Sequence, residues 1–441
     1  MAKYKAYSEY KDSGVEWIGN IPSHWEVASL SKLFSIKAGG DVQQSLFSEV
    51  CSDDYPYPIY TNANDEFAVY GYTKKANYQS NTITVSGRGD VGFAVYRNHA
   101  YDAIIRLLVL APLKQLECKF YSYFINSVID FKVESSAIGQ LSTQQISPYK
   151  SVIPSRVEQR KITIFLDHET AKIDNLIEKQ KQLIELLKEK RQAVISHAVT
   201  KGLNPDVPMK DSGVEWLGDV PAHWDICLLK FKCSAITDGA HISPDTNEGE
   251  HYFVSIKDIK KGIIDFNNSL LTSSASYKYL VKTGCKPFSG DILFSKDGTI
   301  GQTAIVPDDV DFVVASSLII IRADKEKTLP AFMDLLLQSS LVKEQVESFV
   351  KGAALRRLSI QNLEKVFGIF PTLSEQQIIS DYIYAQLNRL DVLESKAVVQ
   401  IQLLEERRTA LISAAVTGKI DVRDWVAPDT QDVEEPQEAT A

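Results

Sequence analysis

The sequence lacks the features of exported, membrane-spanning and metal-stabilised proteins. No window approaches about 18 uncharged apolar residues, and the N-terminal MAKYKAYSEY has no apolar core of a signal peptide. The 5 cysteines form no CxxC pair, which argues against a disulfide framework and against a structural zinc site. We therefore expect a cytoplasmic protein with reduced cysteines, no bound metal and no membrane association.

Catalytic motifs are also missing. The chain has no Walker A segment and no methyltransferase pair of a glycine-rich strand end and an NPPY-like segment. The tripeptide Glu394-Ser395-Lys396 fits part of a nuclease motif, but it lies in a segment that reads as a long helix. We expect a non-enzymatic chain that binds no cofactor and whose partners carry out any chemistry.

Basic residues are fewer than acidic ones, so the net charge is −9. Much of the excess lies in residues 421–441, which are rich in Glu, Pro, Thr and Ala and are predicted to form an acidic disordered tail. The rest of the chain can still carry a basic face, because binding depends on where charges lie.

What the sequence does contain is an internal repeat. The block DSGVEWIGNIPSHWEV, which begins at Asp12, returns as DSGVEWLGDVPAHWDI from Asp211. A second pair, VIPSRVEQRKI and IFPTLSEQQII, sets Glu158 opposite Glu375. His24 and His223 recur before a Trp in a Pro-containing turn, which favours a structural role over metal ligation. The chain is therefore built twice.

Two long helices are predicted, one after each copy of the block. From about Arg156 to Thr200 the sequence has no Pro or Gly, and apolar residues recur at heptad spacing there and again in the second copy. We predict that one apolar seam on each helix packs, made of Leu166, Ile173, Ile177, Ile184, Leu187 and Val194 in the first and of Ile383, Leu387, Leu390, Ile401, Leu404 and Leu411 in the second.

The two helices are expected to pair in an antiparallel coiled coil. Each helix follows its own module, so this pairing places the modules at opposite ends of a spacer about 60 Å long, related by a pseudo-twofold axis. A parallel pairing would crowd the modules together. A plain helical hairpin inside one fold is the alternative, and the long segment between the helices argues against it.

The predicted fold class is α+β, with two globular α/β domains separated by two long antiparallel coiled-coil helices in a pseudo-twofold repeat. Lys201-Gly202 and Asn204-Pro205 mark the joint between the copies. The expected parts are a first globular domain at 1–155, a first helix and linker at 156–207, a second globular domain at 208–371, a second helix at 372–420 and the tail at 421–441.

Each variable module contains a glycine loop between two strand-like runs. NTITVSGRGDVGFAVY, from Asn81, superposes on GDILFSKDGTIGQTAIV, from Gly290. Such a loop lets the backbone approach a ligand closely while one cation, Arg88 or Lys296, points outward. A plain tight hairpin is the alternative for either copy alone, and recurrence in both modules favours binding.

Just before the long helices, SSAIGQLSTQQI aligns with GAALRRLSIQNL, setting Gly139-Gln140 against Arg356-Arg357. Two readers of different base sequences would need such a difference, because Arg prefers guanine and Gln prefers adenine in the major groove. Inconsequential surface variation is the alternative. The remaining candidate DNA contacts are Asn62, Asn64, Lys74, Lys75, Lys257, Lys260 and Lys261.

Together the repeated DSGVEW block, the GDILFSKDGTIG segment, the LSEQQ helix entry and the AVTGK exit resemble the specificity subunits of type I restriction-modification systems. The resemblance implies that the two globular domains, 1–155 and 208–371, are target-recognition domains, each of which reads one half of a bipartite asymmetric site in double-stranded DNA. It also implies that the helices set the spacing and dock two modification (methyltransferase) subunits, that restriction (translocase/nuclease) subunits join them, and that S-adenosylmethionine binds to the modification subunits.

Two other functions remain open at this point. An acidic DNA mimic or adaptor could bind restriction-modification enzymes without reading DNA, but a mimic would spread its carboxylates along the body rather than in a tail. A self-contained methyltransferase or nuclease would be active as a single purified chain, and the missing motifs argue against it.

Overall fold

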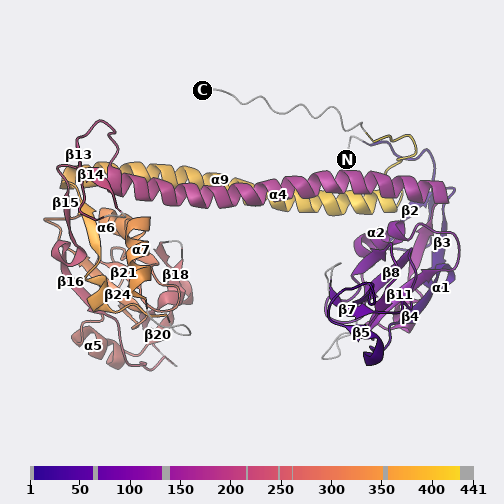
Figure 1. Ribbon diagram of the computed structural model, residues 1–441, viewed down its shortest axis with the longest axis horizontal. Helices are drawn as coiled ribbons and strands as arrows, with labels where there is room; N and C mark the ends of the chain where they lie inside the picture. Colours follow the sequence, from indigo (N-terminus) through magenta and orange to yellow (C-terminus); the bar gives the residue numbers. More distant parts are fainter. Residues whose placement is uncertain are drawn as a thin grey trace. The chain divides into compact units, whose positions relative to one another are not determined.

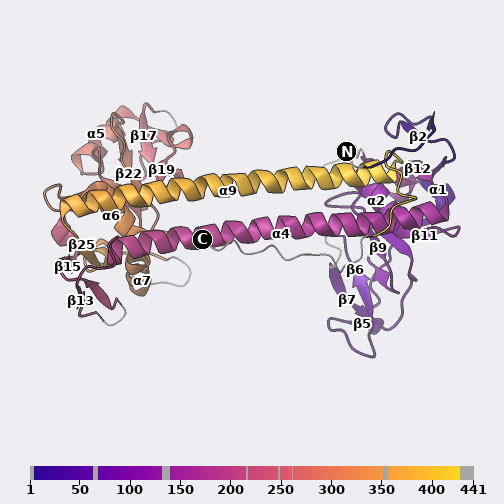
Figure 2. The ribbon, with the colours of Figure 1, turned by 90° about the horizontal axis from the view of Figure 1, so that it is seen from above.

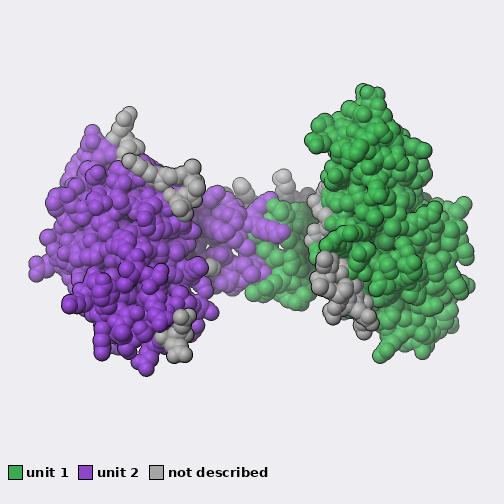
Figure 3. Space-filling model, turned by 90° about the horizontal axis from the view of Figure 1, so that it is seen from below, with its two compact units in different colours: residues 1–180, 399–441 green, residues 181–398 purple. Residues whose placement is uncertain are grey.

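The computed structural model describes residues 4–62, 68–131, 140–214, 217–246, 249–260, 262–350 and 356–427. The chain forms two compact units, shown in different colours in Figure 3: Met1–Gln180 with Val399–Ala441 make unit 1, and Lys181–Val398 make unit 2. Each unit contains one module and parts of both long helices. No helix in the described residues is both long and apolar enough to cross a membrane.

The module of unit 1 is organised around an antiparallel sheet with the strand order β4-β11-β8-β9 (Figure 1). Its middle strand β8, TITVS, is buried at every position, as expected for an uninterrupted apolar and β-branched run. Helix α2 packs on β8 and β9 and completes the core. The bounds are Phe34–Ala38 (β4), Thr82–Ser86 (β8), Ala94–Arg97 (β9), Leu107–Pro112 (β11) and Cys118–Val128 (α2).

A second sheet in unit 1 has the order β10-β6-β7-β5, in which β6 and β10 run parallel. Of two further pairs, β1–β2 closes a hairpin at the repeated block, and β3–β12 joins the end of that block to the strand before the first long helix. The bounds are Tyr10–Asp12 (β1), Asn20–Pro22 (β2), Glu26–Ser29 (β3), Leu30–Leu33 (α1), Gln44–Leu46 (η1), Phe47–Ser48 (β5), Tyr57–Tyr60 (β6), Val69–Thr73 (β7), Asp102–Ala103 (β10), Thr143–Ile146 (α3) and Lys150–Ile153 (β12).

Unit 2 repeats this plan although the two variable segments share little sequence. Its main sheet has the order β16-β24-β21-β22, it contains the parallel pair β17–β23, and its pairs β13–β14 and β15–β25 correspond to β1–β2 and β3–β12 of unit 1. The bounds are Met209–Asp211 (β13), Asp219–Pro221 (β14), Asp225–Leu228 (β15), Leu229–Lys232 (η2), Cys233–Asp238 (β16), His251–Val254 (β17), Ile292–Ser295 (β21), Thr303–Ile305 (β22), Phe312–Val314 (β23), Leu318–Ala323 (β24) and Phe367–Phe370 (β25).

Unit 2 also carries elements between and after these strands. Helix α6 takes the place of α2 against the main sheet, and α7 packs on α6. The bounds are Ile256–Asp258 (η3), Ile259–Lys260 (β18), Ile263–Ile264 (β19), Phe266–Asn268 (η4), Leu270–Thr272 (β20), Ser274–Lys282 (α5), Pro330–Leu337 (α6), Ser340–Phe349 (α7) and Ile360–Leu363 (α8).

The two long helices are α4, Arg156–Lys201, with 46 residues, and α9, Leu373–Val416, with 44 residues. In unit 1 Asp174 of α4 pairs with Arg408 of α9, and the earlier His168 contacts Trp425, which follows α9. In unit 2 Arg191 of α4 pairs with Asp391 of α9. Within unit 1, earlier residues of α4 therefore contact later residues at and beyond the end of α9, so the two helices run in opposite directions (Figure 2). This confirms the predicted antiparallel pairing there.

Most of the predicted helix-packing residues are buried. Leu166, Ile173, Ile177, Leu187, Ile383, Leu387 and Leu411 lie in the core, while Leu390, Ile401 and Leu404 pack partly buried against it. Ile184 and Val194 are only half-buried, and Ile195, 2% exposed, takes the core position beside Val194. A strict seven-residue repeat drifts on a helix of 3.6 residues per turn, so the buried stripe moves to the next residue.

The predicted disordered tail begins too early at residue 421. Asp421 N–H donates to the Lys5 carbonyl at 2.8 Å, Val422 is 1% exposed, and the Trp425 ring packs edge-on against Phe165. The acidic composition of 421–441 concealed these two apolar residues, of which Val422 is buried in unit 1 and Trp425 is partly buried there. Residues 428–441 lie outside the described part of the chain.

Candidate nucleic-acid interface

The repeated block is fastened to the start of each long helix by one glutamate. In unit 1 Glu158 Oε1 accepts from Trp25 Nε1 at 3.2 Å and lies 2.8 Å from His24 Nε2, while its Oε2 accepts from Ser155 N and Oγ. The Ser155 and Glu158 side chains form a capping arrangement at the start of α4.

Unit 2 repeats this clasp with Glu375. Its Oε1 lies 2.7 Å from His223 Nε2 and accepts from Trp224 Nε1 at 3.4 Å, and its Oε2 accepts from Thr372 N and Oγ1. The contacts agree with the structural role predicted for His24 and His223. Sequence comparison found both repeats but not that they touch each other, because their separation along the chain gives no sign of contact.

The two clasp carboxyls respond to opposing influences. Burial raises the pKa of Glu158, but hydrogen bonds from His24, Ser155 and Trp25 outweigh it, so the net pKa is lowered. Glu375 has the same balance and also a lowered pKa. Both carboxylates are therefore ionised at neutral pH, and each one holds a module to a helix.

The glycine loops between the paired strands of each main sheet have the same hydrogen-bond pattern. In unit 1 Gly92 N–H donates to the Ser86 carbonyl at 2.8 Å and Phe93 N–H to Ser86 Oγ at 2.9 Å. In unit 2 Gly301 N–H donates to the Ser295 carbonyl at 3.0 Å and Gln302 N–H to Ser295 Oγ at 2.8 Å. The predicted superposition of these loops is thus confirmed.

Each glycine loop meets the segment that precedes the long helix, and we call this contact the loop junction. In unit 1 Arg88 and Gln140 form an isolated antiparallel bridge, and Leu141 N–H donates to the Gly87 carbonyl at 2.8 Å. In unit 2 Asp297 and Arg357 form the equivalent bridge, and Leu358 N–H donates to the Lys296 carbonyl at 2.9 Å. The structure therefore brings together two sets of predicted DNA contacts that are distant in sequence.

The prediction that Lys296 points outward is wrong. Lys296 is 4% exposed, and its ammonium group pairs with the Asp238 carboxylate at the end of β16. It aligns with Gly87, not with Arg88, and a buried ammonium group needs a charged partner. Arg88, which is half-buried, corresponds to Asp297.

The two neighbouring arginines of unit 2 have different partners. Arg357 donates from Nε to Asp297 Oδ1 at 2.7 Å and from Nη2 to Asp297 Oδ2 at 3.2 Å. Arg356 instead pairs with Glu347 of α7. Arg357 therefore belongs to the loop junction, whereas Arg356 is held by a helix beside it.

The other candidates are dispersed. Asn62 accepts from Gly87 N at 2.9 Å through Oδ1 and so supports the glycine loop. Lys74 lies over the Tyr55 ring at 4.6 Å, Lys75 and Lys257 are exposed, and Lys260 pairs with Asp265 at 2.6 Å. Asn64 and Lys261 lie outside the described residues.

Sequence analysis missed Arg106 and Asp297. Arg106 is exposed and has a φ of 76°, and its carbonyl accepts from Gly87 N–H at 3.0 Å. A Cβ on Gly87 would lie 2.3 Å from that oxygen, so the close approach requires glycine. A positive φ on arginine is uncommon and costs energy, which points to a site worth testing. The alignment of Asp297 with the candidate Arg88 could have identified Asp297 as a site residue.

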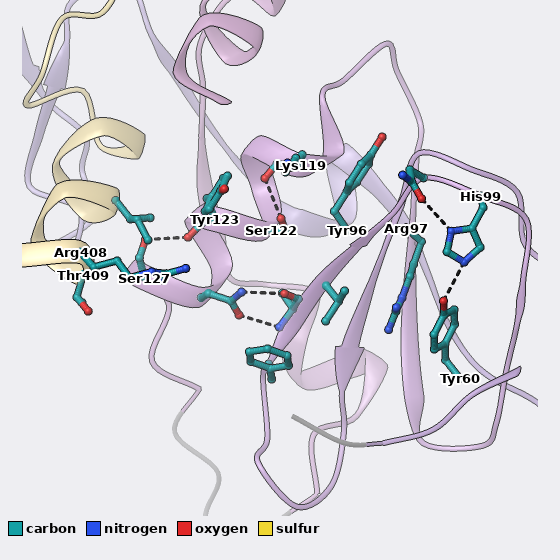
Figure 4. Close-up of a pocket in the computed structure, with 16 residues that line it drawn as sticks. Tyr60, Tyr96, Arg97, His99, Lys119, Ser122, Tyr123, Ser127, Arg408 and Thr409 are labelled. Carbon is teal, nitrogen blue, oxygen red and sulfur yellow. Dashed lines mark hydrogen bonds between the residues drawn. The ribbon is translucent and has the colours of Figure 1, made fainter. Parts of the chain in front are cut away.

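A separate hollow of about 840 Å³ lies in unit 1 beside β9, α2 and the last part of α9 (Figure 4). Two cations on its wall are paired, Lys119 with Asp167 and Arg408 with Asp174, both at 2.7 Å. Burial, and then the charge of Arg97, lowers the pKa of His99. None of the predicted DNA contacts lines this hollow, so it is distinct from the loop junction. Among the described residues, no group of three His, Cys, Asp or Glu is placed to hold a metal ion.

Comparison with known proteins gives a consistent family. A putative type I specificity subunit of Mycoplasma pneumoniae is 32% identical over 169 residues, which cover 37% of this chain and 48% of the relative. The chain thus spans about half the length of that relative. The specificity subunit of the type I restriction enzyme EcoKI of Escherichia coli (strain K12) is 20% identical over 440 residues, covering 93% of this chain and 92% of the relative.

A solved chain from work on complex assembly and conformational transition of the type I R-M system shares the fold, with a TM-score of 0.64 at 14% identity over 91% of this chain and 99% of that chain. The family described as type I restriction modification DNA specificity domain matches residues 22–186 and 231–401, which include most of both modules. Since these segments make up well over half of the sequence, the chain belongs to the type I restriction modification DNA specificity domain family.

Proposed function

We propose that this chain is the DNA-recognition subunit of a type I restriction-modification complex. The module of each unit reads one half of a bipartite asymmetric site in double-stranded DNA. The observation that carries the proposal is the pair of loop junctions, which share one backbone arrangement but hold Arg88 and Gln140 in unit 1 and Asp297 and Arg357 in unit 2. Equivalent positions with different polar side chains suit two readers of different sequences.

The long helices set the spacing of the half-sites and dock two methyltransferase subunits. In support, each unit contains one clasp and one equivalent ion pair between the helices, Asp174–Arg408 in unit 1 and Arg191–Asp391 in unit 2. Each unit therefore offers the same helix surface to a copy of one partner. S-adenosylmethionine binds to those partners, restriction subunits supply translocation and cleavage, and this chain has no catalytic role.

The test is methylome sequencing of a host with and without the gene. We expect one two-part motif, with halves centred about one helical turn apart, to lose its adenine methylation when the gene is deleted. Restoring the gene on a plasmid is the control. A methylome that does not change on deletion would contradict the proposal.

Direct binding separates this function from that of an acidic DNA mimic. The chain assembled with its methyltransferase partner should bind a duplex that carries the motif, with affinity that falls as salt rises because phosphate contacts release counterions. A mimic would instead bind the enzyme and leave the duplex free.

A further inference from the structure

We propose that the two residues bridged at each loop junction form the base-reading pair of that unit, and that Arg357 of unit 2 reads a guanine while Asp297 positions it. This inference rests on the proposed function and deepens it, because it separates a base-reading arginine from the arginine next to it and assigns a role to Asp297.

Within the described part of the chain, the hydrogen bonds of Arg357 to Asp297 engage one edge of its guanidinium group and leave a second edge without a partner. Arg357 uses Nε and one N–H of Nη2 in its side-on pair with the carboxylate. The adjacent end-on edge keeps one N–H on Nη1 and one on Nη2, which lie parallel and match the O6 and N7 acceptors of guanine. The Arg357 side chain as a whole is 59% exposed.

A buried neighbour fixes each strand of the bridge. Next to Arg357, Leu358, 0% exposed, donates its N–H to the Lys296 carbonyl at 2.9 Å. Next to Asp297, Lys296 is buried in its pair with Asp238. The backbone that carries Asp297 and Arg357 is thus held before DNA arrives, which lowers the entropy lost when the arginine contacts a base.

Arg356 provides a natural contrast. Its partner Glu347 lies on α7 and its pair is largely exposed, with 46% of the arginine side chain and 66% of the glutamate side chain accessible. It does not take part in the bridge, which joins Asp297 to Arg357. Arg356 has the same charge as its neighbour but is held by Glu347 of α7 outside the bridge, so it is the matched control.

The equivalent position in unit 1 holds a different reader. Gln140 occupies the place of Arg357, and Arg88 occupies the place of Asp297. A glutamine amide offers one donor and one acceptor, which match N7 and N6 of adenine. The same position therefore selects different bases in the two half-sites, and exchanging its side chain should exchange the base.

The main experiment introduces Arg357→Gln into the full-length chain in its host and sequences the methylome. One guanine in one half of the motif should become adenine or lose its identity, while the other half stays unchanged. With the purified complex, discrimination between the wild-type duplex and one substituted at that guanine should fall roughly 5- to 150-fold. Arg357→Lys, which keeps the charge but not the two parallel donors, should also reduce this discrimination.

Asp297 is tested as a positioning residue. Asp297→Asn should weaken discrimination at the same guanine without affecting the other half-site, and Asp297→Glu, which restores the carboxylate, should recover part of it. A uniform loss of binding to all duplexes by a variant that unfolds at the wild-type temperature would overturn the inference, because it would mark a phosphate contact.

Arg356→Gln is the matched control and should leave the motif unchanged. The inference is also overturned if Arg357→Gln leaves the motif intact or alters both halves equally. A wild-type gene that produces no two-part motif would instead refute the proposed function, so the two failures are distinguishable.

Discussion

The main sheets of the two units have the same strand order, but the loops that leave them hold their charges differently. In unit 2 an acid and a base pair across the loop junction and a lysine is buried beneath it. In unit 1 the same bridge joins Arg88 to Gln140, over a glycine. The residues that fasten module to helix are alike, so the two units share a frame and differ in the side chains at its tip.

The largest effects should come from the shared frame. Trp25→Ala and Trp224→Ala each remove a ring that is at most 2% exposed, and each should lower the free energy of unfolding by about 3–5 kcal/mol. Urea denaturation of the purified chain measures this loss. If one substitution costs less than 1 kcal/mol, the two frames are not equivalent.

The clasp should distinguish the units. Glu158 has a side-chain exposure of 7% against 33% for Glu375, so Glu158→Gln should cost about 1–3 kcal/mol and Glu375→Gln less. Because the pKa of both carboxyls is lowered, this stabilisation is present above the ordinary carboxyl pKa of about 4.3 and is lost as pH falls through the lowered value.

The pH dependence can be checked with urea midpoints of wild-type and Glu158→Gln protein at pH 7 and in acid. The difference between the two proteins should shrink as the wild-type carboxyl becomes protonated. A difference that grows in acid would contradict the assignment of the lowered pKa to the clasp.

A smaller effect of unusual sign is expected at the loop junction of unit 1. Arg106→Gly should raise stability by about 1 kcal/mol, because glycine adopts a positive φ without steric cost. Ser317 is the equivalent residue of unit 2, because its carbonyl accepts from Lys296 N–H as the Arg106 carbonyl accepts from Gly87 N–H. Its φ is not positive. Ser317→Gly is thus the matched control and should lower stability. A loss of stability in Arg106→Gly would show that the loop carries no such strain.

The smallest effects belong to the exposed ion pairs between the long helices. Double-mutant cycles on Asp174 with Arg408 and on Asp391 with Arg191 should each give a coupling of about 0.2–1 kcal/mol that falls with added salt. Equal coupling energies would show that the two units are alike in their helix contacts as well as in the clasp. Clearly unequal coupling energies would show that they are alike in the clasp but not in the helix contacts.

The sequence predicts the long helices, the repeats and the glycine loops because each rests on a local pattern. Helix α4 begins at the predicted Arg156, and the two loops superpose as aligned. The position of Lys296 depends on Asp238 from another strand, and no local pattern could reveal that contact. The same holds for the clasp, where Glu158 meets Trp25.

Composition gave a wrong boundary for the disordered tail and gave no information on the strand order of the modules. Residues 421–427 carry acids around Val422 and Trp425, and only the fold shows that both side chains have an apolar surface to cover. The common strand order of the modules was also beyond prediction, because their variable segments share few residues and strand pairing depends on distant partners.

The discontinuous make-up of unit 1 has a consequence for synthesis on the ribosome. Unit 2 is one continuous stretch, Lys181–Val398, whereas the core of unit 1 joins Ile21 and Trp25 to Val416, Ile420 and Val422. Since a chain is made from its N-terminus, unit 2 has all of its residues first. Unit 1, although begun earlier, completes its core only when the end of α9 has emerged, and until then part of its apolar surface has no partner within the chain.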